Sequence, residues 1–175
     1  MGRGPDDTTE LTLLLGTEML MVAGVTRKAG EARKRLQAAI DSGKGLERFA
    51  KMVAAQGGDA RAVRDPSRLP KAKRTVAVES QKSGYVTACD CLELGLCGVA
   101  MGAGRTRADQ KVDPAVGIEL AKKPGDRVKR GETLALLHVQ SKVGADKHAT
   151  RVRAAFSVGK QAPKASPILI ERIAR

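Results

Sequence analysis

Aromatic side chains are scarce in this sequence, which has two phenylalanines, one tyrosine and no tryptophan among 175 residues. Proteins that bind single-stranded nucleic acid commonly stack bases on aromatic rings, and this chain has few rings to offer. Its net charge is nevertheless +13, and residues 71–175 carry +10 of it, interleaved with acidic residues. Because aromatic rings are few and the basic residues are interleaved with acidic ones, we expect no nucleic-acid partner. The excess charge fits either plain solvation or a surface for phosphate-bearing small molecules.

Long apolar runs are also missing. No stretch approaches the roughly 20 residues that a membrane-spanning helix needs, and the opening MGRGPDDTTE lacks the apolar stretch of a signal peptide. We expect a cytoplasmic protein with no membrane partner. The composition, 42% apolar and 29% charged, is typical of a folded globular chain.

Residues that could build a metal or catalytic site are few. Cys89, Cys91 and Cys97 cannot all pair with one another, and neither histidine stands at ligand spacing from them, so we expect reduced core thiols, no metal and no cofactor. His138 lies within the apolar run of residues 134–139, which predicts a strand histidine bonded to a neighbouring carbonyl. His148 has basic residues around it, so we expect it at an exposed position of a helix. With no nucleophile elbow and no paired carboxylates, the sequence predicts no catalytic residue in this chain.

The first part of the chain predicts helices. Residues 7–10, Asp-Thr-Thr-Glu, resemble a capping box, and the helix that follows is apolar on nearly every face. Such a helix needs neighbours on all sides, so we expect it to belong to a larger fold. Two more helices are predicted, over residues 26–40, ended by Gly43, and over residues 46–53, ended by Gln56-Gly57-Gly58.

Residues 65–70, Asp-Pro-Ser-Arg-Leu-Pro, break regular structure, and we place a domain boundary there, between residues 1–70 and 71–175. The second part alternates short strands with glycine turns, so the fold class expected for the chain is α+β. Its expected elements are strands near 76–78, 85–86, 118–120 and 134–137, a helix that Asp90 caps and Gly102 closes with Leu92, Leu96 and Val99 on one face, a helix over 145–158, and a final strand over 168–170.

Residues 124–134 contain a G-D-x-V-x-x-G-x-x-L pattern that resembles biotinyl and lipoyl carrier domains, which are flattened barrels of short strands. A carrier presents a lysine at a hairpin tip, ten residues after the second glycine, and Ser141 occupies that position here. Lys142 comes one residue late, and a slip of one residue in a strand sends the side chain to the other face. We keep the barrel-like fold as the expectation and carrier function as an alternative.

Residues 101–107, Met-Gly-Ala-Gly-Arg-Thr-Arg, form a glycine turn with two arginines. Backbone N–H groups and guanidinium forks of this kind can hold a phosphate. The turn lacks the third glycine of a dinucleotide-binding loop and the G-K-[ST] of a P-loop. A flexible turn with solvated charges is the alternative interpretation.

The order of these pieces resembles the thymidine phosphorylase and pyrimidine-nucleoside phosphorylase family, C-terminal portion only. The segments that carry the resemblance are Gly4-Pro5-Asp6-Asp7, Glu10-Leu11, Glu18-Met19-Leu20, Glu31-Ala32-Arg33, Leu36, Phe49, Met52-Val53-Ala54-Ala55-Gln56-Gly57-Gly58-Asp59, residues 65–70, Ser83-Gly84-Tyr85-Val86, Met101-Gly102-Ala103-Gly104-Arg105, Val116-Gly117 and Gly125-Asp126-Arg127-Val128. AMP phosphorylases share parts of this series.

The resemblance implies that residues 1–70 belong to the large α/β domain of a parent enzyme, and that residues 71–175 form its C-terminal α/β hammerhead, a barrel-sandwich-like domain. The implied activity is pentosyl transfer from a pyrimidine nucleoside to phosphate, giving base and (deoxy)ribose 1-phosphate. The implied partners are those two substrates and the N-terminal part of a homodimeric enzyme, which would supply the phosphate loop and the base-binding residues. The glycine–arginine turn is the implied cleft-closure loop, through Gly102, Gly104 and Arg105. A non-catalytic binding or interaction module is the other alternative.

Overall fold

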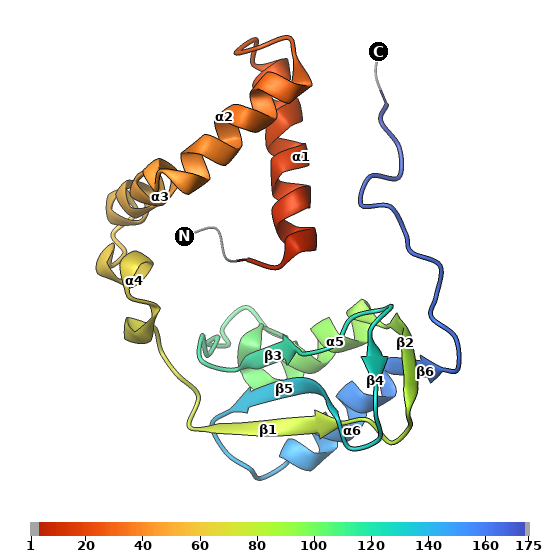
Figure 1. Ribbon diagram of the computed structural model, residues 1–175. Helices are drawn as coiled ribbons and strands as arrows, with labels where there is room; N and C mark the ends of the chain where they lie inside the picture. The colour runs from red at the N-terminus through yellow and green to blue at the C-terminus, as the bar shows by residue number, and fades with distance from the viewer. Residues whose placement is uncertain (1–3, 174–175) are drawn as a thin grey trace. The chain divides into compact units, whose positions relative to one another are not determined.

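The computed structural model describes residues 4–173 and divides the chain into two compact units (Figure 1). The second unit is the continuous segment Leu69–Ala165, and the first unit holds the helical residues before it together with the segment that starts at Ser166. The division between Arg68 and Leu69 lies inside the Pro-containing segment 65–70. No helix within residues 4–173 is long and apolar enough to cross a membrane.

The first unit is built from helices. They are α1 (Asp6–Val22), α2 (Ala29–Asp41), α3 (Lys44–Ala55), the single turn α4 (Arg61–Arg64) and a 3₁₀ turn, η1 (Pro66–Arg68). Helices α1 and α2 pack closely at Gly16, where a Cβ atom would lie 2.9 Å from a methyl of Leu36. Gly43 and Gly57 follow α2 and α3 with φ of 75° and 79°, which confirms the predicted helix ends.

The predicted capping box at the start of α1 is wrong. The residue before the helix is Pro5, with no side-chain cap, and the carboxylate of Asp7 instead accepts from the adjacent N–H of Thr8. Helix α2 also lacks a side-chain cap at its N-cap residue, Lys28. The Thr26 hydroxyl accepts from the N–H of Lys28 and donates to Glu31, and the helix begins at Ala29, later than the predicted residue 26.

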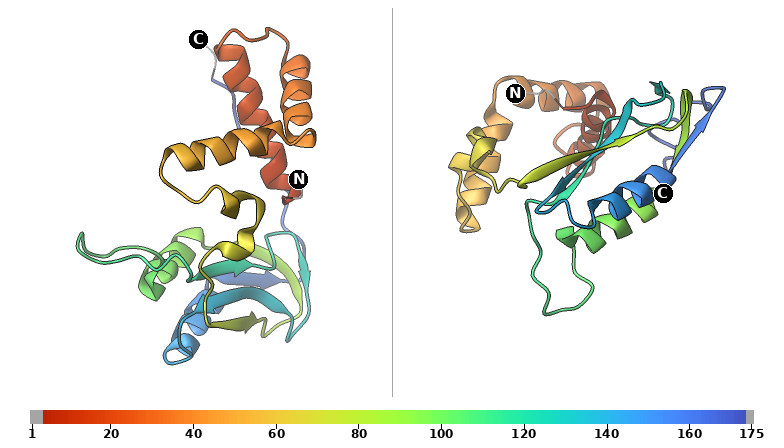
Figure 2. Two further views of the ribbon diagram at one scale, coloured as in Figure 1. Left: turned by 90° about the vertical axis from the view of Figure 1, so that its left-hand side faces the viewer. Right: turned by 90° about the horizontal axis from the view of Figure 1, so that it is seen from below.

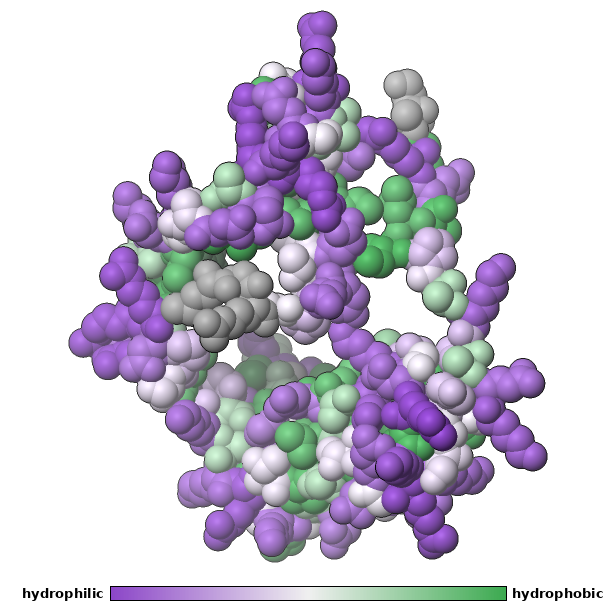
Figure 3. All heavy atoms as spheres, viewed as in Figure 1, coloured by the Kyte–Doolittle hydropathy of each residue, from purple (hydrophilic) through white to green (hydrophobic). Residues whose placement is uncertain are grey.

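Much of α1's apolar surface is open. Leu13 and Thr17 are its buried residues, whereas Leu15, Met19 and Val22 keep 53%, 71% and 88% of their surface exposed. Figure 3 shows hydrophobic side chains at the surface of this helical unit. Within residues 4–173, α1 thus lacks the surrounding neighbours that its composition calls for.

The second unit contains two three-stranded antiparallel sheets and two helices (Figure 2). One sheet has the order β1 (Arg74–Glu79), β5 (Thr133–Val139), β3 (Gly117–Leu120), and the other has the order β4 (Arg127–Val128), β2 (Gly84–Cys89), β6 (Phe156–Gly159). Helix α6 (Ala145–Ala154) packs on β1 and β5, and α5 (Cys91–Gly98) packs on α6. The α+β prediction is confirmed.

A single apolar core fills this unit, and it holds residues from both sheets and both helices. Its fully buried large side chains are Leu134, Leu137, Val78, Val86, Val128, Val152 and Cys97. Strand β5 contributes most because it is the central strand of its sheet and has alternate residues facing the core.

Three predictions for the chain beyond residue 70 need correction. The helix expected over 145–158 ends at Ala154, because Phe156 is buried and pairs with Cys89 as the start of β6. The apolar run at 168–170 forms no strand, since no partner strand lies beside it among the described residues. Helix α5 buries Leu94 and Cys97, while Leu92 and Leu96, the predicted face, are 74% and 48% exposed.

Candidate functional site

The glycine–arginine loop begins where α5 ends. Asp90 caps α5 as predicted, its carboxylate accepting from the N–H of Glu93 at 3.0 Å. The helix then widens into a π-helical turn, η2 (Val99–Ala103), which Gly102 breaks with a φ of 104°. The amide of Asp113 donates to the carbonyl of Gly102 at 2.9 Å, so the two ends of the loop are tied together.

Gly104 permits a close approach within this loop. A Cβ atom there would lie 2.7 Å from a Val99 methyl, which is well inside van der Waals contact. The backbone at Gly104 is extended, with φ of −145°, so space and not backbone conformation requires glycine at this position. The turn is therefore packed against the end of its own helix.

The arginines of the loop differ in their partners. Arg107 pairs with Asp109 at 3.0 Å, and the side-chain carbonyl of Gln110 accepts from the N–H and hydroxyl of Thr106. The guanidinium of Arg105 is exposed and has no hydrogen bond or ion pair within residues 4–173. The two guanidiniums are thus not held together in this structure, and that of Arg105 is open to a ligand or a partner.

Asp113 anchors the base of the loop to the end of β5. Its carboxylate accepts from the N–H of Ala115 at 2.9 Å and from the side-chain amide of Gln140 at 2.8 Å. These hydrogen bonds, the Ala115 amide foremost, lower the pKa of Asp113. A hollow of about 230 Å³ lies beside this anchor, with Ser141 and His148 in its wall. The loop base is thus a fixed structure, linked to β5 and α6.

Behind the hollow, His148 is half-buried on α6, which corrects the exposed position predicted for it. Its Nδ1 lies 3.7 Å from the thiol sulfur of the buried Cys97. Burial raises the pKa of the Cys97 thiol, so this sulfur is protonated at neutral pH and is a poor nucleophile. Nearby, Arg151 of α6 forms a bidentate pair with Glu93 of α5 and fixes the two helices together.

His138 also departs from its prediction. Its Nε2 lies 3.1 Å from a carboxylate oxygen of Glu119 on the neighbouring strand β3, and the expected carbonyl partner is not the one it uses. The pair spans two hydrogen-bonded strands at the surface. Histidine and carboxylate therefore form a cross-strand contact.

The described part of the chain offers no metal centre, since it holds no cluster of three or more His, Cys, Asp or Glu side chains at ligand distance. The carrier interpretation also lacks its geometry. Ser141 and Lys142 lie in the turn between β5 and α6, whereas a carrier lysine sits at the tip of a β-hairpin. Neither residue is presented between two paired strands.

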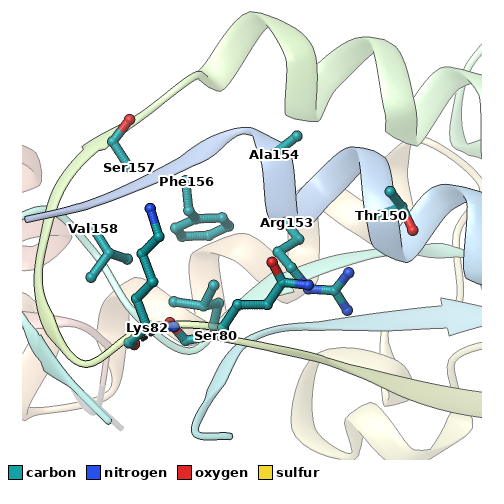
Figure 4. A pocket seen from close by; sticks show the side chains of 10 residues that line it. Ser80, Lys82, Thr150, Arg153, Ala154, Phe156, Ser157 and Val158 are labelled. Carbon is teal, nitrogen blue, oxygen red and sulfur yellow. Dashed lines mark hydrogen bonds between the residues drawn. The ribbon is translucent and has the colours of Figure 1, made fainter. Parts of the chain in front are cut away.

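Sequence reasoning missed a second hollow, of about 460 Å³, on the other side of α6. Its wall includes Lys82 from the β1–β2 turn and Arg153 from α6 (Figure 4). These residues are far apart in the sequence, and only the high net charge of the second part pointed toward a basic surface. The strand and helix pairing that joins them has no short sequence signature.

Comparison with known proteins gives the family. Residues 85–159 match the model of the pyrimidine nucleoside phosphorylase C-terminal domain. Over 137 residues, which is 78% of the chain, the sequence is 43% identical to a pyrimidine-nucleoside phosphorylase of Staphylococcus aureus strain bovine RF122 / ET3-1, and 42% identical to that of strain USA300. The chain spans about a third of the length of these relatives, 32% in each case. The matched domain contains α5, the glycine–arginine loop, β5 and α6. The chain therefore belongs with the C-terminal portion of the pyrimidine-nucleoside phosphorylase family.

Proposed function

We propose that this chain acts as the C-terminal part of a pyrimidine-nucleoside phosphorylase. In that reaction phosphate attacks the anomeric carbon of a pyrimidine (deoxy)nucleoside, and free base and (deoxy)ribose 1-phosphate are released. The family match over residues 85–159 carries this proposal. The parent enzyme is proposed to be a cytoplasmic homodimer.

The chemistry needs an anion site for phosphate and donors that stabilise the leaving base. Neither the loop at Gly102 nor the hollow beside Asp113 combines these groups: the loop arginines are not held together, and the hollow is lined by the Asp113 carboxylate and by no lysine or arginine. We place the reacting groups outside these 175 residues, in the part of the relatives that the chain does not span.

The loop has the construction expected of a closing element. Its base is fixed by the bonds from Asp113 to Gly102 and Gln140, while the exposed Arg105 has no hydrogen bond or ion pair within residues 4–173. A fixed base with an exposed cation suits a segment that meets a partner surface or an anionic substrate when a cleft closes. Gly102, Gly104 and Arg105 are thus proposed to support closure, without taking part in bond breaking.

Phosphate-dependent release of thymine from thymidine tests the proposal. The 175-residue chain alone is expected to show no turnover, and a chimera that joins the other two thirds of the Staphylococcus aureus enzyme to it is expected to be active. Robust turnover by the chain alone would show that the reacting groups are inside it. A folded but inactive chimera would contradict the phosphorylase function itself.

A second candidate is a binding or interaction module that keeps the fold without the reaction. The separate, complete core of residues 69–165 favours it, because such a unit can be stable by itself. Sedimentation distinguishes the two: a settled module is monodisperse, whereas the open apolar surface of α1 should drive association if it is normally covered.

A further inference from the structure

The pocket of about 460 Å³ lies between the β1–β2 turn, helix α6 and strand β6, entirely within the second unit. Its volume is in the range of pockets that bind small organic molecules. Apolar side chains, Leu134 and Phe156 among them, form its floor, and both are buried at 1% and 8% exposure. Hydroxyl and amide side chains complete the wall, namely Ser80, Gln81, Thr150 and Ser157.

The charge of this pocket has one sign. Lys82 and Arg153 line it, and no carboxylate is among its lining residues. Figure 4 shows the Lys82 ammonium and the Arg153 guanidinium on either side of the Phe156 ring. The whole unit, residues 69–165, has 18 Lys and Arg against 9 Asp and Glu. Elsewhere many of these cations are paired or isolated, but here two of them share one hollow.

Hydrogen bonds hold the Arg153 guanidinium itself and the backbone of the turn that carries Lys82. Arg153 donates from Nε to the carbonyl of Glu79 at 2.9 Å, and its terminal nitrogens have no protein partner within residues 4–173. The turn that carries Lys82 is fixed by the buried Ser80 hydroxyl, which donates to the carbonyl of Lys82 at 2.7 Å and accepts from its amide. The backbone of Ser80 is bonded in turn to Glu132 and Gly131. The Arg153 guanidinium and the backbone at Lys82 are therefore fixed before a ligand binds.

We propose that this pocket binds a small organic phosphate, with the phosphoryl group between Lys82 and Arg153 and the organic part on Phe156 and Leu134. Two cations match a phosphate monoester, which carries nearly two negative charges at neutral pH, better than they match a single carboxylate. A guanidinium whose Nε is already bonded still offers its terminal N–H groups to phosphate oxygens. The site is independent of the phosphorylase reaction and goes beyond the proposed function.

Titration of the ¹⁵N-labelled 175-residue chain with uridine 5′-monophosphate tests this inference, with uridine and inorganic phosphate as separate arms. The nucleotide should shift the amide signals of the β1–β2 turn and of Phe156 to Val158 in a saturable way, and more tightly than either arm does alone. Replacing Lys82→Glu should weaken binding by about tenfold or more, since a charged hydrogen bond is lost and a repulsion is added.

The matched control is Lys142→Glu, which makes the same change of charge at an exposed lysine of the β5–α6 turn, outside this pocket. It should leave nucleotide binding unchanged, and unaltered signals of the other core residues report that both variants are folded. The proposal is overturned if the nucleotide shifts no signals at the pocket, if it binds no more tightly than inorganic phosphate, or if both variants weaken binding equally.

Discussion

Gly104→Ala is expected to destabilise the second unit through one defined clash. The new Cβ would lie 2.7 Å from a Val99 methyl, so that methyl must retreat by about 0.8 Å to reach an ordinary separation of about 3.5 Å. Val99 is β-branched and sits in a helical turn, where its χ1 angle has little freedom. Overpacking of this kind costs about 1–3 kcal/mol of unfolding free energy. Backbone strain adds nothing, because φ at Gly104 is −145°.

The measurement is a double-mutant cycle, in which urea unfolding gives the free energies of the wild type, Gly104→Ala, Val99→Ala and the double variant. Val99→Ala removes the methyl that would clash, so the cost of adding the Gly104 methyl should fall by about 1 kcal/mol or more in its presence. Additive costs would show that Gly104 is not required for this approach. Gly102→Ala is the contrasting variant: a φ of 104° makes alanine strained there, and Val99→Ala should not relieve it.

Three further outcomes are expected. In an active chimera, Arg105→Ala should lower kcat/KM for thymidine phosphorolysis about tenfold, whereas Arg107→Ala, which removes a cation already paired within the loop, should change it little; equal effects would contradict closure through Arg105. The hydrogen bond from Arg151 lowers the pKa of the Glu93 carboxyl below 4.5, so Glu93 loses its proton more readily in the folded protein than in the unfolded chain. The stabilisation by Glu93 is therefore present above its unfolded pKa and is lost as the pH falls through its folded pKa. Glu93→Gln should flatten the loss of stability on acidification below about pH 4.5, and a pH profile of urea unfolding that does not change would refute this. Finally, the exposed Cys91 should react with a thiol reagent in the folded chain, while the buried Cys97, whose thiol pKa is raised, should react only on unfolding; equal rates would contradict that burial.

Local signals in the sequence predicted the elements well where a single residue decides them. Asp90 caps α5 because its short carboxylate reaches the free N–H of Glu93, and Gly43 and Gly57 end helices because they adopt positive φ. The apolar character of α1 was also read correctly from composition. These features depend on residues that are close in the sequence, so they can be predicted from the sequence alone.

Features that depend on tertiary contacts were predicted less well. Residues 156–158 were expected to continue the helix, but pairing of Phe156 with Cys89 makes them part of strand β6. Leu92 and Leu96 are as apolar as Leu94, and only the packing of α5 on α6 decides that Leu94 and Cys97 face inward. The charged residues around His148 in the sequence led to the prediction of an exposed position, whereas in the structure His148 contacts the buried Cys97.

The basic pocket shows why charge in a sequence does not by itself locate a site. An isolated surface cation is well solvated and gains little from a single anion, so the excess of basic residues over 69–165 has no predictable consequence. Helix α6 places Arg153 near the end of β1, and the bonds around Ser80 fix the turn from which Lys82 lines the same pocket. Since no carboxylate lines this hollow, no residue of its wall neutralises the two cations. An anion that enters there gains from both at once, on a surface that is already desolvated along one side.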